Sequence, residues 1–110
     1  MSVCELAVHY VPCWHADPRT DRWHGKGWTP WQLIRSAQPR YEGHRQPVRP
    51  AWGMVDDTDP HVAAREIDLA ADHGVCSFLY HWHHFDDGPF LHDALDRGLL
   101  KAANIDRSKF

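Results

Sequence analysis

The sequence lacks the segments that would place a protein in or across a membrane. Its 110 residues contain no apolar run close to the roughly 20 residues that a membrane-spanning helix needs. The N-terminus also lacks the basic segment and apolar core that mark a secretory signal. These absences predict a cytoplasmic protein with no membrane insertion.

Cysteine is scarce, and its spacing does not indicate a disulfide framework. The three cysteines, Cys4, Cys13 and Cys76, are an odd number and form no Cys-x-x-Cys pair. Two of them lie in apolar, strand-like runs. We therefore expect buried, reduced thiols, which agrees with a reducing compartment.

The chain also has little excess charge of either sign. Its formal net charge is -3, and acidic and basic residues are mixed along the sequence. This balance argues against nucleic acid or a membrane surface as a partner. The length is that of one small domain, so residues 1–110 are treated as a single unit.

Histidine and tryptophan are abundant, with ten and six residues respectively. Both side chains combine a flat face with a hydrogen-bonding edge, which suits pockets that hold polar, ring-shaped ligands. Tryptophan also fills cores and histidine also occurs on surfaces, so the position of each residue decides its interpretation.

Two apolar segments are predicted to form strands. Residues 3–11 end before Pro12, which cannot donate a hydrogen bond to a β-ladder. Residues 75–80 are apolar without alternation, which is typical of a parallel strand covered on both faces. Gly74, just before this strand, suits the C-cap of a helix.

Two cap-and-proline pairs predict helices in the middle of the chain. Thr29-Pro30 and Asp59-Pro60 each supply an N-cap followed by a first-turn proline. The first pair predicts a helix over residues 31–37, and the second predicts a helix that Gly74 ends. Residues 40–57 show no steady period and are expected to be irregular.

Glycine and proline also indicate the structure of the remaining segments. Residues 16–30 are polar, glycine-bearing and aromatic, which is typical of a long ordered loop, and such loops are usually functional. Gly88-Pro89 is expected to open a third helix, with apolar residues Leu91, Ala94, Leu95 and Leu99 on one face. The order of strands and helices is that of an α/β protein made of βα units.

Polar and aromatic side chains follow both predicted strands. His9 and Tyr10 lie at the exit of the first strand, and His81, Trp82 and His83 come directly after the second. Ligands bind at the carboxyl ends of parallel strands in α/β proteins, so these residues are the leading site candidates.

A series of Trp, Gly and Pro landmarks extends along nearly the whole chain. The series is Trp23-x-Gly25-x-Gly27-Trp28-Thr29-x-Trp31, Pro39, Gly43-His44-x-Gln46-Pro47, Trp52-Gly53, Asp59-Pro60, Ala70-x-x-x-Gly74 and Asp86-Asp87-Gly88-Pro89-Phe90-Leu91. In order and spacing it resembles the N-terminal part of the glycoside hydrolase family 99-like domain. That group includes proteins associated with lipopolysaccharide and O-antigen synthesis.

The resemblance implies a (β/α)₈ TIM barrel of roughly 300 residues or more. Residues 3–11 and 75–80 would be its first two strands, and residues 108–110 would begin the third. On this interpretation the chain is an incomplete barrel, holding about two βα units and the start of a third strand. It would then be a fragment or a prematurely ended reading frame.

Glycoside hydrolysis needs two carboxyl groups beside the scissile bond. Asp86 and Asp87 are the carboxylates nearest a strand exit, but adjacent loop residues rarely point at the same atom. The resemblance implies that the catalytic acids lie on later strands. Catalytic residues therefore stay unassigned, and we predict no glycosidase turnover from this chain alone.

A sugar-binding rim is the function that these residues predict. Pyranose rings present apolar C–H faces and a belt of hydroxyls, so their sites need aromatic plates with donors and acceptors at the edge. The expected partner is a carbohydrate or glycan, with no metal or other cofactor. The candidate plates are Tyr10, Trp28, Trp31 and Trp82, and the candidate edges are His9, His44, His81, His83 and Asp86.

Two alternatives stay open at this point. His81 and His83 would point to the same side of a continuing strand, and with His9 they would form a three-histidine set of the kind that holds catalytic zinc. The other alternative is a truncated piece without activity, whose strand edges and apolar faces lack the units that should cover them.

Overall fold

A computed structural model describes residues 4–103 and 105. Its central feature is a parallel pair of strands, β1 (Ala7–Tyr10) and β2 (Ser77–Tyr80), joined through the helix α3 (Pro60–Asp72). In the register, Ala7 lies opposite Ser77 and Tyr10 opposite Tyr80. This βαβ arrangement confirms the two predicted strands and their parallel order.

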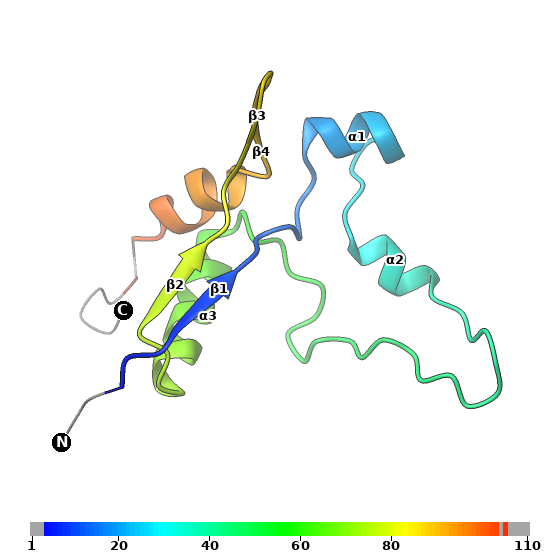
Figure 1. Ribbon diagram of the computed structural model, residues 1–110, viewed down its shortest axis with the longest axis horizontal. Coiled ribbons are helices and arrows are strands. Elements are labelled where there is room, and N and C mark those ends of the chain that lie inside the picture. Colours follow the sequence, from blue (N-terminus) through cyan, green and yellow to red (C-terminus); the bar gives the residue numbers. More distant parts are fainter. Residues whose placement is uncertain (1–3, 104, 106–110) are drawn as a thin grey trace.

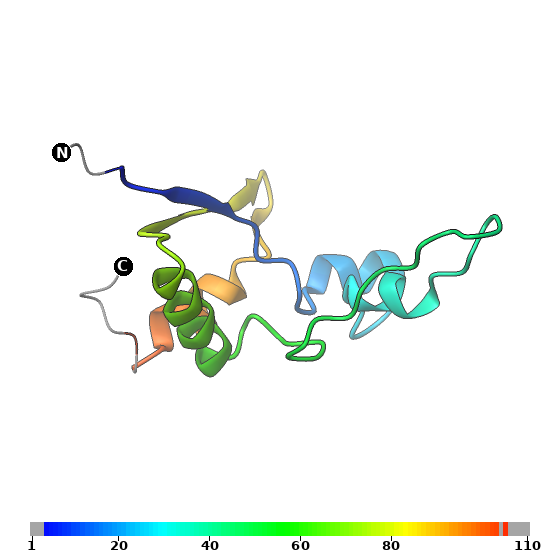
Figure 2. The same ribbon diagram turned by 90° about the horizontal axis from the view of Figure 1, so that it is seen from below.

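A β-hairpin follows directly after β2 (Figure 1). It consists of β3 (His83–Phe85) and β4 (Gly88–Phe90), which pair antiparallel. After it come a π-helical turn, η1 (Ala94–Gly98), and a 3₁₀ turn, η2 (Leu99–Lys101). The hairpin projects beyond the carboxyl ends of β1 and β2, while α3 and η1 lie together on one side of the parallel sheet (Figures 1 and 2).

Two short helices, α1 (Pro18–His24) and α2 (Trp31–Ser36), lie between β1 and α3. Together with the irregular segment after α2 they form an arm, residues 18–56, that extends away from the sheet (Figure 2). The radius of gyration is 16.5 Å, above the roughly 13 Å of a compact domain of this length. The chain therefore buries less of its surface than a self-contained domain does.

Both predicted helices are present, but only α3 has the predicted cap, because Pro30 is the N-cap residue of α2 and no side chain caps that helix. Asp59 accepts a hydrogen bond from the His61 N–H at 2.8 Å, and α3 runs to just before Gly74, which has a positive φ of 86°. The expectation of a loop over residues 16–30 was wrong for α1. Asp17 caps this helix in front of Pro18, by the same chemistry that begins α3.

The helix expected to open at Gly88-Pro89 was also misplaced. Both residues lie in β4, opposite Phe85 and His84, because Gly88 adopts the positive φ of 123° with which the chain returns from the hairpin turn. Helical structure begins later, at Ala94. The third strand expected at residues 108–110 lies outside the described residues.

The two faces of the parallel sheet differ. Tyr10 faces α3, where its ring stacks on Phe78. On the other face His9 and Leu79 are exposed, Leu79 to 50%. The prediction that residues 75–80 are covered on both faces was therefore wrong, because helices cover this sheet on one side only.

The buried apolar core is small and rich in alanine. In the described part of the chain it consists of Trp31, Ala63, Ala64, Ile67, Ala94 and Ala102. Most of these residues come from α3 and the turns that pack on it. No described helix is long and apolar enough to cross a membrane.

The cysteines are free, as expected, but they are not buried. Cys4 is exposed, and Cys13 and Cys76 are half-buried. The Cys76 thiol lies 3.1 Å from the Leu6 carbonyl oxygen at the start of the sheet. The expectation of buried thiols was therefore wrong for all three cysteines.

A buried polar pair joins the segment after β1 to the segment before α3, on either side of the arm. His15 Nδ1 lies 2.5 Å from Asp57 Oδ1, and the two residues are 2% and 3% exposed. The other carboxylate oxygen of Asp57 accepts the Trp14 N–H at 2.9 Å. At Gly98 of η1, an added Cβ would lie 2.4 Å from the Asp57 carbonyl oxygen, so only glycine fits there without a shift.

We expect Asp57→Ala to lower the free energy of unfolding by about 3 kcal/mol, because it leaves His15 and the Trp14 N–H buried without their partner. Urea denaturation followed by circular dichroism measures this loss. Asp56→Ala is the matched control. The Asp56 side chain is exposed and accepts hydrogen bonds from Thr58, so its loss should cost about 1 kcal/mol or less. Equal losses in the two variants would contradict the anchoring role of Asp57.

Candidate functional site

A cavity of about 520 Å³ lies at the carboxyl ends of β1 and β2. We call it the strand-end cavity. It lies where the sequence predicted the site, and four of the predicted site residues line it. The lining residues are His9, Leu79, Tyr80, His81, Trp82 and His83.

The two parallel strands bring His9 and His81 into contact. His9 Nδ1 lies 2.8 Å from His81 Nε2, and the two rings meet edge to face with centroids 5.0 Å apart. His81 N–H donates to the Tyr10 carbonyl at 2.9 Å, which extends the ladder past the end of β2. The imidazole of His81 therefore lies on the open face, two residues beyond Leu79, where it meets His9.

Trp82 provides an exposed aromatic plate at the cavity. Its side chain is 52% exposed and lies tilted against His84, with ring centroids 5.5 Å apart. His83 begins β3 and packs against Phe90 across the hairpin. The cavity thus has imidazole edges beside an indole, which are the two kinds of side chain that the sequence predicted for this rim.

The hairpin is held in place by α1. Arg19 Nη2 donates to Asp87 Oδ1 at 2.5 Å, and the Arg19 guanidinium lies 4.6 Å from the Phe85 ring centre. This hydrogen bond lowers the pKa of the Asp87 carboxyl below its usual range. Sequence reasoning did not find this contact, since 68 residues separate its partners. Asp86 is exposed at the adjacent turn and does not line the strand-end cavity.

Tyr10 lies on the opposite side of the sheet from the strand-end cavity. Its hydroxyl donates to Glu66 Oε2 of α3 at 2.6 Å. Burial, together with the neighbouring Glu66 carboxylate, raises the pKa of the Tyr10 hydroxyl far above its usual value. Burial also raises the pKa of Glu66, although the hydrogen bond from Tyr10 opposes this effect. Tyr10 therefore joins the strand to the helix.

The two tryptophans predicted as plates in the middle of the chain pack within the arm. Trp31 is 7% exposed, stacks on Trp14 at 4.0 Å between ring centroids, and donates its indole N–H to the Val55 carbonyl at 2.8 Å. Trp28 stacks on His24 with centroids 4.3 Å apart. Neither lines the strand-end cavity.

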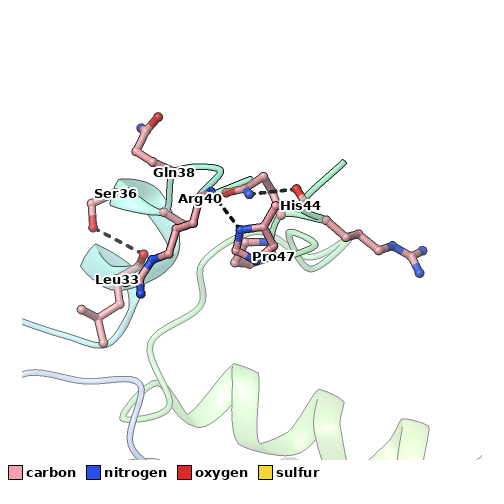
Figure 3. Close-up of a pocket in the computed structure, with 9 residues that line it drawn as sticks. Leu33, Ser36, Gln38, Arg40, His44 and Pro47 are labelled. Atoms are coloured by element: carbon pink, nitrogen blue, oxygen red, sulfur yellow. Dashed lines mark hydrogen bonds between the residues drawn. The ribbon is translucent and has the colours of Figure 1, made fainter. Parts of the chain in front are cut away.

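His44 lies in a second hollow of about 580 Å³ at the far end of α2 (Figure 3). Its Nδ1 accepts the Arg40 N–H at 3.1 Å, and its ring stacks on Tyr41. The hollow is formed mainly by the loop after α2, beside Leu33 and Pro47. The structure thus gives His44 a place in the turn of this loop, apart from the strand-end cavity.

Among residues 4–103 and 105, no group of three or more His, Cys, Asp or Glu side chains is arranged to hold a metal ion. His9 and His81 touch, but His83 does not complete a set with them. The three-histidine zinc site considered as an alternative is therefore not formed by the described residues.

Comparison with known proteins identifies a family for this chain. The family described as "Glycosyltransferase WbsX" matches residues 6–108. The chain belongs to the WbsX family. This confirms the resemblance to a carbohydrate-related group, although the match does not name glycoside hydrolase family 99.

Two curated relatives of this WbsX-family chain are the uncharacterized protein WxcX from two strains of Xanthomonas campestris pv. campestris. Each is 36% identical over 81 residues, which is 73% of this chain. The matched part is 12% of the length of each relative. No solved structure matches the chain.

The raised pKa of Glu66 predicts a dependence of stability on pH. The ordinary pKa of a glutamate is 4.5, and the pKa of Glu66 is higher than this in the folded state. At a pH above 4.5, the folded state therefore holds the Glu66 proton more tightly than the unfolded state does. The free energy of unfolding therefore falls as the pH rises from about 4.5 through the raised folded value. Glu66→Gln removes the ionisation and retains an acceptor for Tyr10, so it should flatten this fall.

Urea denaturation at pH 5, 6 and 7 measures this effect. Glu42→Gln, in the exposed loop after α2, is the control and should keep the wild-type slope. If Glu66→Gln shows the same fall in stability with pH as the wild type, Glu66 is not the group responsible.

Proposed function

We propose that this chain is the opening part of a carbohydrate-active (β/α)₈ domain of the glycoside hydrolase family 99-like type, and that its strand-end cavity binds a sugar ring. The observation that carries the proposal is the meeting of His9 and His81 from separate parallel strands beside the exposed indole of Trp82. The membership in the WbsX family supports carbohydrate as the ligand class.

Each cavity residue has a distinct part in this proposal. The half-exposed Trp82 stacks on the apolar C–H face of the sugar, and the imidazoles of His9 and His81 bond its hydroxyls from the side. While neutral, the pair keeps one N–H donor and one acceptor free for these hydroxyls, because one nitrogen of each ring is used in the contact between the rings.

The open sheet supports the proposed barrel architecture. β1 and β2 are both edge strands in the described part of the chain, and one face of the pair is exposed at His9 and Leu79. In a barrel, further strands would pair with these edges, and the open face would look into the barrel interior. The much greater length of the relatives leaves room for these units.

The proposal assigns sugar recognition to this chain and no acid or base. The residues that line the strand-end cavity include no carboxylate. Glycoside hydrolysis needs two such groups, whereas the name of the WbsX family refers to glycosyl transfer. Both reactions bind a sugar ring, so recognition at the strand-end cavity is compatible with either.

We expect Trp82→Ala to weaken sugar binding by about tenfold, because stacking on an aromatic face contributes about 1.4 kcal/mol in such sites. Binding is measured by titrating the 110-residue chain with a panel of monosaccharides while recording NMR shifts of the histidine imidazole C–H resonances, which all variants keep. Circular dichroism of each variant first confirms that it folds as the wild type does.

Trp52→Ala is the matched control for this experiment. Trp52 lies against Arg65 of α3, behind the sheet, and its removal should leave the sugar affinity unchanged. Equal weakening in both variants, or no shift with any sugar, would contradict the proposed site. A structure of the matching region of WxcX tests the architecture by showing whether further strands pair with β1 and β2.

A further inference from the structure

The strand-end cavity is lined by three imidazoles and by no carboxylate. Asp86 is exposed at the hairpin turn and does not line the cavity. Asp87 of the hairpin pairs with Arg19, and Glu66 of α3 lies behind the sheet, where it accepts the Tyr10 hydroxyl. The titratable groups that line the cavity are therefore His9 from β1, Tyr80 and His81 from β2 and its end, and His83 from β3.

The contact between His9 and His81 fixes how protons are shared in this cavity. One proton lies between His9 Nδ1 and His81 Nε2, because a hydrogen bond between two ring nitrogens needs one donor and one acceptor. Two ring nitrogens remain free, His9 Nε2 and His81 Nδ1. In the neutral pair, one of them carries a proton and donates, and the other has a lone pair and accepts. When the pair takes up one more proton, both remaining nitrogens become donors and the pair carries one positive charge.

With this extra proton, the pair is better suited to an anionic oxygen than to a neutral hydroxyl. Hydrogen bonds between an imidazolium N–H and a charged oxygen are roughly twice as strong as neutral ones. A neutral sugar hydroxyl also has a proton to donate, and proteins often receive it on a carboxylate, which this cavity lacks. His83 adds a third imidazole on the same side of the chain.

Resting on the proposed sugar site, we propose that its ligand is a sugar bearing an anionic group, a carboxylate or a phosphate ester, and that the His9–His81 pair binds this group. The proton bound on association comes from solvent and stays on the imidazole pair, so no covalent bond changes. Trp82 holds the sugar ring beside it. The ligand class of the recognition site is then an acidic or phosphorylated sugar.

The experiment compares three probes on the 110-residue chain at pH 6: glucose, glucuronate and glucose 1-phosphate. We expect at least one anionic probe to bind about tenfold tighter than glucose, from the added strength of charge-assisted hydrogen bonds. Which of the two shows the preference distinguishes a uronate from a phosphate ester. Calorimetry at pH 7 in two buffers of different ionisation enthalpy should show net proton uptake with the preferred probe.

His81→Gln tests the pair directly, because glutamine keeps hydrogen-bonding capacity and cannot become charged. This variant should bring the affinity ratio of anionic to neutral probe close to one and abolish proton uptake. His61→Gln, at an exposed position on α3, is the control and should keep both. If His81→Gln does not fold, His9→Gln removes the other member of the pair and has the same expected result.

The outcomes separate this inference from the proposed function. Equal affinity for glucose and both anionic probes would overturn the anionic ligand and leave the sugar site standing. Binding of none of the three probes would overturn both. An anionic preference that survives in His81→Gln and His9→Gln would show that the imidazole pair is not the binding group.

Discussion

The buried contact between His15 and Asp57 is the constraint on which the rest of the structure depends. It joins the segment that leaves β1 to the segment that enters α3, so it holds the start of the crossover helix beside the end of β1. Removing two polar side chains from water is unfavourable unless they bond to each other, and here they do so at 2.5 Å. The close approach of Gly98 to Asp57 then brings η1 against the start of α3. A molecule with so small an apolar core relies on this polar anchor more than a larger domain would.

Strand alternation decides which residues reach the candidate site. Successive side chains of a strand point to opposite faces, so His9 and Tyr10 are separated although they are neighbours in sequence. His9 meets His81 on the open face, whereas Tyr10 bonds to Glu66 on the covered face. The pairing of β1 with β2 therefore brings the histidine pair together on one face and places Tyr10 against α3 on the other. A shift of one residue in that register would exchange the two faces and remove the histidine pair.

Local signals in the sequence predicted more of the fold than of the site. A capping aspartate before Pro60 and an apolar run before His81 are local patterns, each formed by residues next to one another in sequence. Both α3 and β2 lie where these patterns predicted them. Asp17-Pro18 carries the same capping pattern, but the glycines that follow it favoured a loop. The pairing of Arg19 with Asp87 joins positions far apart in sequence and has no local signal. Trp28, Trp31 and His44 show the limit most clearly, because residue type alone could not tell a stacking plate from a loop anchor.

The exposed face of the sheet is where the remaining strands of the proposed barrel, and any catalytic acid on them, would lie. Leu79 lies on the same face as the strand-end cavity and is half exposed, and an apolar side chain in that position is stabilised when further structure faces it. In the proposed barrel, that structure would be the remaining strands, whose carboxyl ends would surround the same cavity. A positively charged histidine pair here would also lower the pKa of any carboxyl group brought near it. An acid that must keep its proton would then have to lie on the far side of the sugar from His9 and His81, so the recognition residues of this chain would constrain where the catalytic acid can be.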